Sequence, residues 1–135
     1  MIRKGTRADL PAAARIYDEI LDREAASQSY TNWIKGKYPT VRDAERALEN
    51  DTFYVMEQDG EVVGVANLNH VQPPEYQKIE WAVPAEGREV LVIHTLCISP
   101  RHSGRGYATQ FVRFAEEHAR RLGCRTIRFD TYEGN

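Results

Sequence analysis

The sequence predicts an α/β fold in which helices pack against a mixed central sheet. Three observations favour this class. Helical and strand-like periodicities alternate along the chain. The run at 89–99 is almost continuously apolar, which is typical of a central strand buried on both faces. A glycine-containing loop then joins this run to an amphipathic helix. The expected order of elements is β-α-α-β-β-β-α-β.

The length and composition predict one domain spanning residues 1–135. A chain of 135 residues can close one hydrophobic core and is too short for two. With 41% apolar and 28% charged residues it belongs with soluble globular proteins, and no apolar stretch approaches the roughly 18 residues of a membrane helix. The first residues lack the pattern of a secretory signal, so we expect a cytoplasmic location. Cys97 and Cys124 are expected to be free thiols, with no metal site, because neither has a second Cys or His at zinc spacing.

The first third of the chain predicts a strand and two helices. Residues 2–6 form a short strand candidate. Asp9 is expected to cap a helix over 10–24, because its carboxylate can accept N–H groups of the first turn. The polar residues 27–32 end this helix. The sequence Thr40–Asp43 resembles a capping box that opens a second, short helix.

A β-hairpin is expected next. Residues 52–58 and 61–69 are rich in β-prone side chains, and Asp59-Gly60 between them suits a two-residue turn with positive φ angles. Pro73-Pro74 marks the end of the second strand.

The last third predicts a strand, a loop, a helix and a final strand. Pro100 ends the strand at 89–99, and a helix over 107–122 follows the loop. Its expected apolar stripe comprises Ala108, Phe111, Val112, Ala115, His118, Ala119 and Leu122. Gly123 suits the position just beyond the helix end. The last strand covers 125–132, with Ile127 and Phe129 facing inward.

The net charge of −2 is unevenly distributed. Residues 51–100 carry eight acidic and two basic side chains, whereas 101–135 carry seven basic and four acidic ones. This asymmetry fits a site that takes one cationic and one anionic ligand, and it equally fits two ordinary solvated faces.

The glycine loop is the most informative feature. Gly104 and Gly106 permit a tight turn, and the N–H groups of the following helix's first turn can bind phosphate. The loop is neither a dinucleotide fingerprint, because position 109 is Thr, nor a P-loop, because it lacks Gly-Lys-Ser/Thr. A purely structural turn remains an alternative.

The stretch from Ile98 to Ala108 resembles the signature of the GNAT superfamily of acetyl-CoA-dependent N-acyltransferases. That motif is Gln/Arg-x-x-Gly-x-Gly/Ala, preceded by an apolar strand residue and a proline. The register that keeps the proline and the helix start in place puts the motif on Ser103, Gly106 and Ala108, with Ser replacing the usual Gln/Arg. A register two residues earlier fits the letters better, but it leaves the helix start two residues late. The resemblance implies a GNAT-like sheet and acetyl-CoA as co-substrate.

The resemblance also implies cofactor contacts. Backbone N–H groups that would bind the pyrophosphate are those of Gly104, Arg105, Gly106, Tyr107, Ala108 and Thr109. A bulge on the motif strand would leave a backbone N–H of Leu96, Cys97 or Ile98 available to the thioester carbonyl. Arg101 and Arg105 can attract CoA phosphates, and Asn135 matches an Asn that contacts the pantetheine arm in relatives.

His94 stands where several relatives carry a general base. An imidazole ordinarily titrates near neutral pH, which suits removal of a proton from the acceptor amine. The alternative is a buried, hydrogen-bonded histidine inside a strand. Direct transfer in a ternary complex is favoured over a covalent acyl-enzyme on Cys97. No general acid is named.

For the acceptor, Tyr30, Trp33 and Trp81 lie in segments that wall the acceptor pocket in relatives, and ordinary packing residues are the alternative. The acidic middle, Glu80 included, favours a cationic amine. We expect no nucleic-acid or membrane partner and leave a homodimer open. The family normally continues beyond the position of Asn135 through a helix and one or two strands. Three explanations therefore stay open: the chain is a fragment, it is completed by a neighbouring subunit, or it is a shortened relative. Two other functions also stay open: a CoA-binding module without turnover, and an interaction domain whose loop is merely structural.

Overall fold

Within the residues that the structure describes, five strands form one mixed sheet in the order β1-β2-β3-β4-β5. The computed structural model describes the chain except for 27–38, 73–84, 86 and 129–135. The strands are β1 (Ile2–Lys4), β2 (Phe53–Gln58), β3 (Glu61–Asn69), β4 (Val90–Ile98) and β5 (Thr126–Arg128). The helices are α1 (Leu10–Ala26), α2 (Val41–Glu49) and α3 (Tyr107–Leu122). Neighbouring strands pair antiparallel, except β4 and β5, which are parallel. The predicted class and element order are confirmed.

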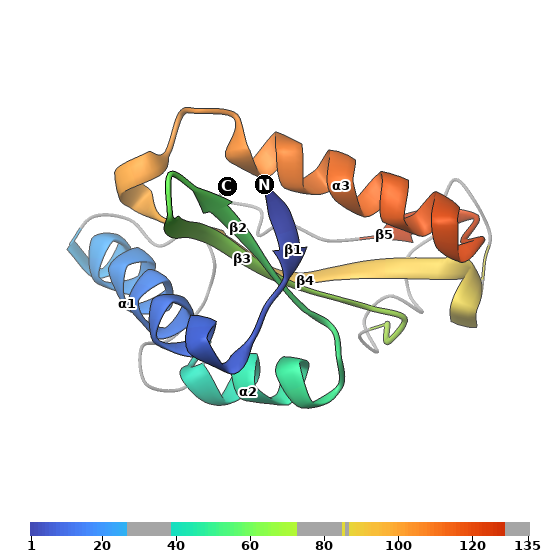
Figure 1. Cartoon of the computed structure of the whole chain (residues 1–135), viewed down its shortest axis with the longest axis horizontal. Helices are drawn as coiled ribbons and strands as arrows, with labels where there is room; N and C mark the ends of the chain where they lie inside the picture. The colour runs from blue at the N-terminus through green and yellow to red at the C-terminus, as the bar shows by residue number, and fades with distance from the viewer. Residues whose placement is uncertain (27–38, 73–84, 86, 129–135) are drawn as a thin grey trace.

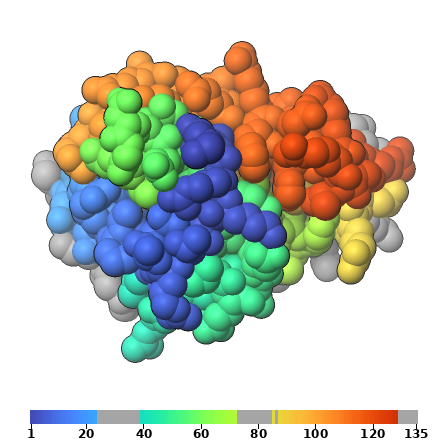
Figure 2. Space-filling model, in the orientation of Figure 1, coloured from blue at the N-terminus to red at the C-terminus, as the bar shows by residue number. Residues whose placement is uncertain are grey.

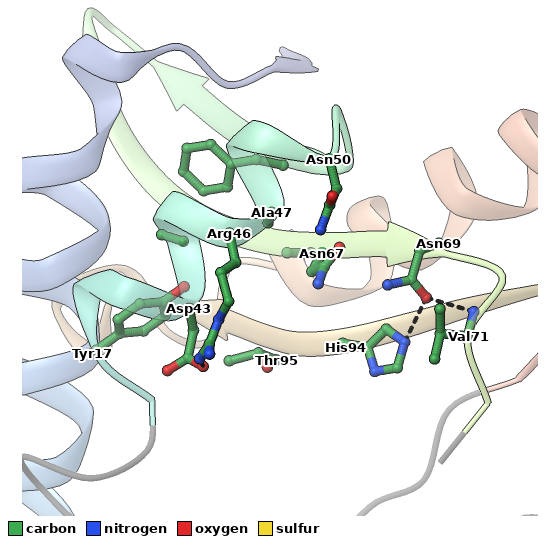
Figure 3. A pocket seen from close by; sticks show the side chains of 13 residues that line it. Tyr17, Asp43, Arg46, Ala47, Asn50, Asn67, Asn69, Val71, His94 and Thr95 are labelled. Atoms are coloured by element: carbon green, nitrogen blue, oxygen red, sulfur yellow. Dashed lines mark hydrogen bonds and ion pairs between the residues drawn. The ribbon is translucent and has the colours of Figure 1, made fainter.

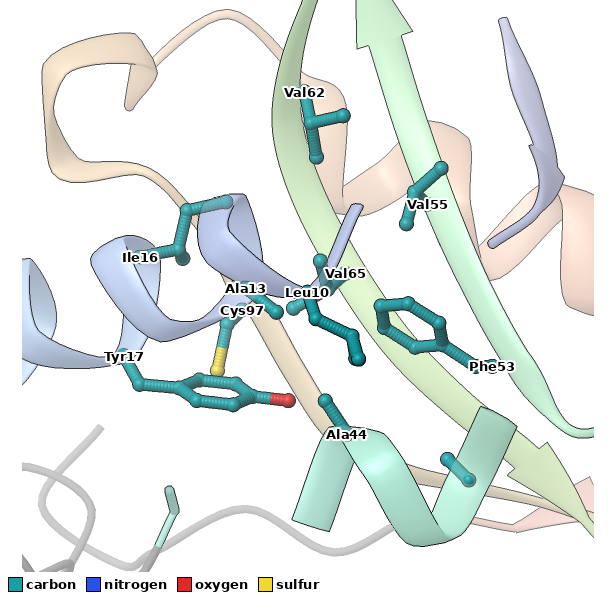
Figure 4. Packing of buried hydrophobic residues seen from close by; sticks show 11 residues of the cluster. Leu10, Ala13, Ile16, Tyr17, Ala44, Phe53, Val55, Val62, Val65 and Cys97 are labelled. Carbon is teal, nitrogen blue, oxygen red and sulfur yellow. The ribbon is translucent and has the colours of Figure 1, made fainter. Parts of the chain in front are cut away.

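The sheet separates two hydrophobic clusters (Figure 1). Side chains alternate along a strand, so Phe53 and Val55 of β2 pack with α1 and α2, whereas Tyr54 and Met56 pack with α3. The cluster on the α1 and α2 side, drawn in Figure 4, consists of Leu10, Ala13, Ile16, Tyr17, Ala44, Ala47, Phe53, Val55, Val62, Val65 and Cys97. Burial on both faces makes β3 and β4 the rigid centre from which the site is built.

The prediction that Asp9 caps the helix beginning at residue 10 is wrong. A 3₁₀ turn, Arg7–Asp9, precedes α1, and Asp9 closes a capping box with Thr6 instead of capping Leu10. Its Oδ2 accepts the Thr6 N–H at 2.7 Å, while both carboxylate oxygens accept bonds from the Arg3 guanidinium. These bonds hold the pKa of Asp9 below its usual range, the Arg3 bond being the largest cause. The Arg3 guanidinium on β1 thus binds the carboxylate that was expected to cap α1.

The second capping box and the hairpin are confirmed. The Thr40 N–H donates to Asp43 Oδ2 at 2.8 Å, as a capping box requires, and α2 begins at Val41. Asp59 and Gly60 have φ angles of 52° and 79°, the pair of positive values expected of the hairpin turn.

The end of the chain follows the prediction with one correction. Helix α3 has the predicted bounds, and Gly123 ends it with a φ angle of 78°. Ala108 and Leu122 are exposed rather than part of the apolar stripe, and Phe114 packs against the cluster instead. Strand β5 lies within the predicted range, and Phe129 lies outside the described residues. No helix in the described ranges is long and apolar enough to cross a bilayer.

Beneath α3, an imidazole and a phenol meet against the sheet. His118 Nε2 lies 3.3 Å from Tyr54 Oη, and the imidazole stacks on Phe114 with ring centroids 5.9 Å apart. Burial lowers the pKa of His118, helped by the positive charges of Arg121 and Lys4 and by His70. The folded protein therefore favours the neutral imidazole.

We expect the free energy of unfolding to fall as the pH drops below about 6.5, the ordinary pKa of histidine. Below that value the unfolded chain binds the His118 proton more strongly than the folded chain does, so acid favours unfolding. Denaturant titrations at several pH values test this, with His118→Phe as the comparison. The variant should lose less stability on acidification, and parallel pH curves for the two proteins would contradict the assignment.

Candidate active site

The motif strand β4 is interrupted by a bulge at its centre. Val65 pairs with Cys97 and Asn67 with His94, so β4 uses one residue more than β3 over this stretch. Thr95, within the bulge, has a φ angle of 52°, which is rare for a β-branched side chain. Such backbone strain costs about 1–3 kcal/mol and clusters at functional sites. The bulge that the resemblance implied is present.

A pocket of about 230 Å³ opens beside this bulge (Figure 3). It lies between the two N-terminal helices and the adjoining ends of β3 and β4. The described residues that line it are Tyr17, Asp43, Ala44, Arg46, Ala47, Asn50, Phe53, Ala66, Asn67, Asn69, Val71, His94 and Thr95. Its wall is thus partly apolar and partly built from amide side chains.

His94 reaches this pocket from β4. Its side chain is half-buried, and Nε2 lies 2.7 Å from Oδ1 of Asn69 on the neighbouring strand. His94 is therefore hydrogen-bonded, as in the structural alternative, and it also borders a cavity large enough for a small amine.

The described lining of the pocket carries one acidic and one basic side chain, so the expected acidic acceptor site stays a prediction. These charged residues are Asp43 and Arg46, which form an ion pair with 2.7 Å between Oδ1 and Nη2. Four of the eight acidic residues of 51–100 form ion pairs elsewhere in the described structure. The described ion pairs are Asp51 with Lys4, Glu57 with Arg3, Glu61 with Arg101 and Glu89 with Arg125. Glu80 lies outside the described residues.

The hydrogen-bond pattern of β4 shows where its free N–H groups point. The Ser99 N–H donates to Val63 O at 2.8 Å. Because donors alternate in an antiparallel ladder, the Cys97 N–H faces β3, whereas those of Leu96 and Ile98 face the opposite side. Among the described residues, β4 pairs with β5 over Val90–Val92, so β5 lies on the side of β4 that Leu96 and Ile98 face.

The glycine loop ends against the N-terminus of α3. Gly104 and Gly106 both have φ angles of 77°, and a Cβ on either would meet only open space. The first helical hydrogen bond runs from Gln110 N–H to Gly106 O, so the N–H groups of Tyr107, Ala108 and Thr109 precede it. The Ser103 hydroxyl donates to Pro100 O at 3.0 Å. The loop therefore offers backbone N–H donors. At Ser103, where the family motif has Gln or Arg, the side chain is already hydrogen-bonded.

Carboxylates from α1 and β3 bind the basic side chains of the loop. Figure 2 shows the tip of the β2–β3 hairpin, in green, against this loop, in orange. Arg101 pairs with Glu19 at 3.1 Å and with Glu61 at 3.2 Å, and His102 Nε2 lies 3.2 Å from Glu61. The bond from His102, followed by the charge of Arg101, lowers the pKa of Glu61. Arg101 is therefore already neutralised, whereas Arg105 contacts only a neutral ring atom, His102 Nδ1 at 3.2 Å, among its described contacts.

Several predicted site residues lie outside the described residues: Tyr30, Trp33, Trp81 and Asn135. Sequence reasoning missed Asn69, Asn67 and Arg46. The alternation of Asn67 and Asn69 along one strand was a usable signal, because residues two apart share a face. Nothing in the sequence alone pointed to the α2 residues.

Comparison with known proteins yields one family and many similar folds. The family model of the Acetyltransferase (GNAT) family matches residues 15–135. A GNAT-family acetyltransferase of Streptococcus agalactiae has a TM-score of 0.76 at 22% identity, covering 87% of this chain and 69% of that one. The ribosomal-protein-alanine N-acetyltransferase of Brucella melitensis has 0.63 at 23%, covering 90% and 67%.

A third similar structure was solved with ligands. The N-acetylglutamate synthase of Neisseria gonorrhoeae, complexed with coenzyme A and N-acetyl-glutamate, has a TM-score of 0.55 at 21% identity, covering 92% of this chain and 23% of that one. At these identities the likeness shows the fold. Among curated proteins, no match to the chain is found.

Proposed function

The chain belongs to the acetyltransferase (GNAT) family, and on that premise we propose that it transfers an acetyl group from acetyl-CoA to a primary amine. The observation that carries the proposal is the position of His94. It lines a pocket beside the bulge of β4, on the strand whose far end leads into the glycine loop. One strand thus connects a proton acceptor, backbone donors for a thioester and a phosphate-binding turn. The cytoplasmic location expected from the sequence stays a prediction.

The loop residues fit the pyrophosphate of CoA. Two glycines with left-handed φ angles turn the backbone toward open space, and the first-turn N–H groups of α3 carry the partial positive charge of a helix N-terminus. Ser103 would contribute its backbone, because its hydroxyl is bonded to Pro100 O. This supports binding from Gly104 to Thr109 through main-chain groups.

The β4 donors fit the thioester. The N–H groups of Leu96 and Ile98 face away from β3, and in the proposed complex either can donate to the thioester carbonyl oxygen. Negative charge grows on that oxygen when an amine attacks, so a preorganised donor lowers the barrier. Cys97 directs its N–H to β3 and is buried, which favours direct transfer over a covalent acyl-enzyme.

In the proposed reaction, the amine nitrogen attacks the thioester carbon from the pocket. A C–N bond forms, the C–S bond breaks, and one proton leaves the nitrogen for His94. The CoA thiolate takes up one proton from solvent, to which His94 releases its own. The products are an acetamide and free CoA. The pocket's balanced charges and amide side chains suit a polar amine on a small molecule or a peptide.

Two measurements test the proposal in order. Calorimetric titration with acetyl-CoA should show binding, and a thiol assay across a library of amines should show release of free CoA with at least one of them. No heat at millimolar acetyl-CoA would contradict the cofactor site. Binding without CoA release from any amine would favour the alternative, a CoA-binding module without turnover.

We expect Arg105→Gln to weaken acetyl-CoA binding about threefold at low salt, because an exposed cation beside the loop attracts the phosphates through solvent. The matched control is Arg101→Gln, whose cation is already paired with two carboxylates. Calorimetry at low and high salt measures both. An effect of Arg101→Gln as large as that of Arg105→Gln would contradict this assignment, as would an effect that salt does not reduce.

A further inference from the structure

Asn69 determines which ring nitrogen of His94 carries the proton. Asn69 Oδ1 lies 2.9 Å from the Val71 backbone nitrogen and 2.7 Å from His94 Nε2 (Figure 3). A backbone N–H can only donate, so the Asn69 atom that faces Val71 must be the amide oxygen rather than the nitrogen. The same oxygen faces His94, and an oxygen of an amide only accepts. Nε2 of His94 must therefore be the donor.

We propose that Asn69 is a positioning residue that holds neutral His94 as the Nε2–H tautomer, with its lone pair on Nδ1. The inference rests on the proposed function, in which His94 accepts the proton of the amine. Proton acceptance then takes place at Nδ1, on the ring edge turned away from Asn69. Without Asn69 the ring loses the hydrogen bond that sets this tautomer.

Two charged residues and a phenol also line the described part of the pocket. Asp43 and Arg46 come from α2 and bind each other, while Tyr17 comes from α1. Asn69 Oδ1 also accepts a hydrogen bond from the Val71 N–H, so this oxygen stays in place when His94 changes its protonation state.

His70 provides an internal reference for the opposite tautomer. Its Nδ1 lies 2.8 Å from the backbone oxygen of Val90, and a carbonyl oxygen only accepts, so Nδ1 of His70 carries the proton. His70 lies next to Asn69 in sequence and does not line the pocket. One spectrum of the whole chain can therefore contain both tautomers.

The test combines nitrogen NMR of the imidazoles with steady-state kinetics on the wild type, Asn69→Ala and Asn69→Asp. In the wild type we expect a proton on Nε2 of His94 and on Nδ1 of His70. Asn69→Ala should abolish the hydrogen-bonded Nε2–H signal and mix the two His94 nitrogen shifts, with the His70 signals unchanged. Its kcat should fall about tenfold, as is typical when the partner of a functional histidine is removed, at an unchanged KM for acetyl-CoA.

Asn69→Asp keeps an oxygen for both Val71 and His94, so the Nε2–H signal should return. Its carboxylate also favours the imidazolium, so the acidic limb of the pH–rate profile should move to higher pH. If Asn69 had a purely structural role, its replacement would change neither the Nε2–H signal of His94 nor the acidic limb of the pH–rate profile.

A wild-type His94 protonated on Nδ1 would overturn the inference, as would His94 shifts that are unchanged in Asn69→Ala. If the spectra behave as expected while all three proteins turn over equally, the tautomer assignment stands and the proposed role of His94 as the base fails instead. Should Asn69→Ala not fold, Asn69→Asp and the wild-type spectrum still decide the question.

Discussion

Replacement of His94 by alanine is expected to lower kcat about 100- to 10,000-fold, the usual contribution of a general base, while leaving the Kd of acetyl-CoA unchanged. The imidazole borders the pocket on the strand that also carries the proposed thioester donors, so its loss removes the proton acceptor without disturbing the glycine loop. Single-turnover kinetics with a saturating amine, together with calorimetric titration of acetyl-CoA, measures the two quantities separately.

The matched control for this variant is His70→Ala. His70 is also a half-buried, hydrogen-bonded histidine, but it bonds a backbone oxygen and is not among the described residues that line the pocket. Its replacement should leave kcat within a few-fold of the wild type. Equal losses in the two variants would mean that His94 acts through the stability of the sheet. An unchanged kcat in His94→Ala would remove this residue from the mechanism.

Replacement of Gly106 by alanine is expected to weaken acetyl-CoA binding about five- to thirtyfold. An L side chain pays about 1–2 kcal/mol for the left-handed conformation that Gly106 adopts at a φ angle of 77°. Alanine would relax toward a negative φ angle in the free protein and turn the first N–H groups of α3 away. Binding would then have to restore the strained conformation, which reduces the affinity by the same free energy.

Gly123→Ala is the control, because Gly123 has a φ angle of 78° at the other end of the same helix, and a Cβ there also meets nothing. Both variants should lose similar stability in urea titrations, and only Gly106→Ala should lose affinity for acetyl-CoA. If the two bind acetyl-CoA equally well, the loop is a structural turn and the cofactor site lies elsewhere.

Local signals in the sequence were sufficient for most of the fold. The hairpin follows from Asp59-Gly60, because few residue pairs tolerate two positive φ angles, and α2 follows from the Thr40 and Asp43 capping box. The bounds of α3 follow from the glycines on either side of it. In each case, residues close in sequence decide the backbone conformation.

The cap prediction failed because side chains outside the expected cap bind the carboxylate. Asp9 was expected to cap α1, but Arg3 and Thr6 bind its carboxylate. Long-range packing also pairs four acidic residues of 51–100 with Lys4, Arg3, Arg101 and Arg125, and the attraction of a cationic amine by the acidic middle stays a prediction. A charge count along the chain carries no information about which charges the fold will pair.

The sequence by itself determined the α/β class, the element order, the glycine loop before α3 and the family resemblance, because each depends on local patterns of a few neighbouring residues. Only the tertiary structure decided where His94 lies and that it borders a pocket. The bulge at Thr95, the pairing of β3 with β4 and the packing of α2 bring Asn69, Arg46 and His94 around one pocket from three elements. Such a pocket arises from long-range packing and register, and neither is encoded in the spacing of any one segment.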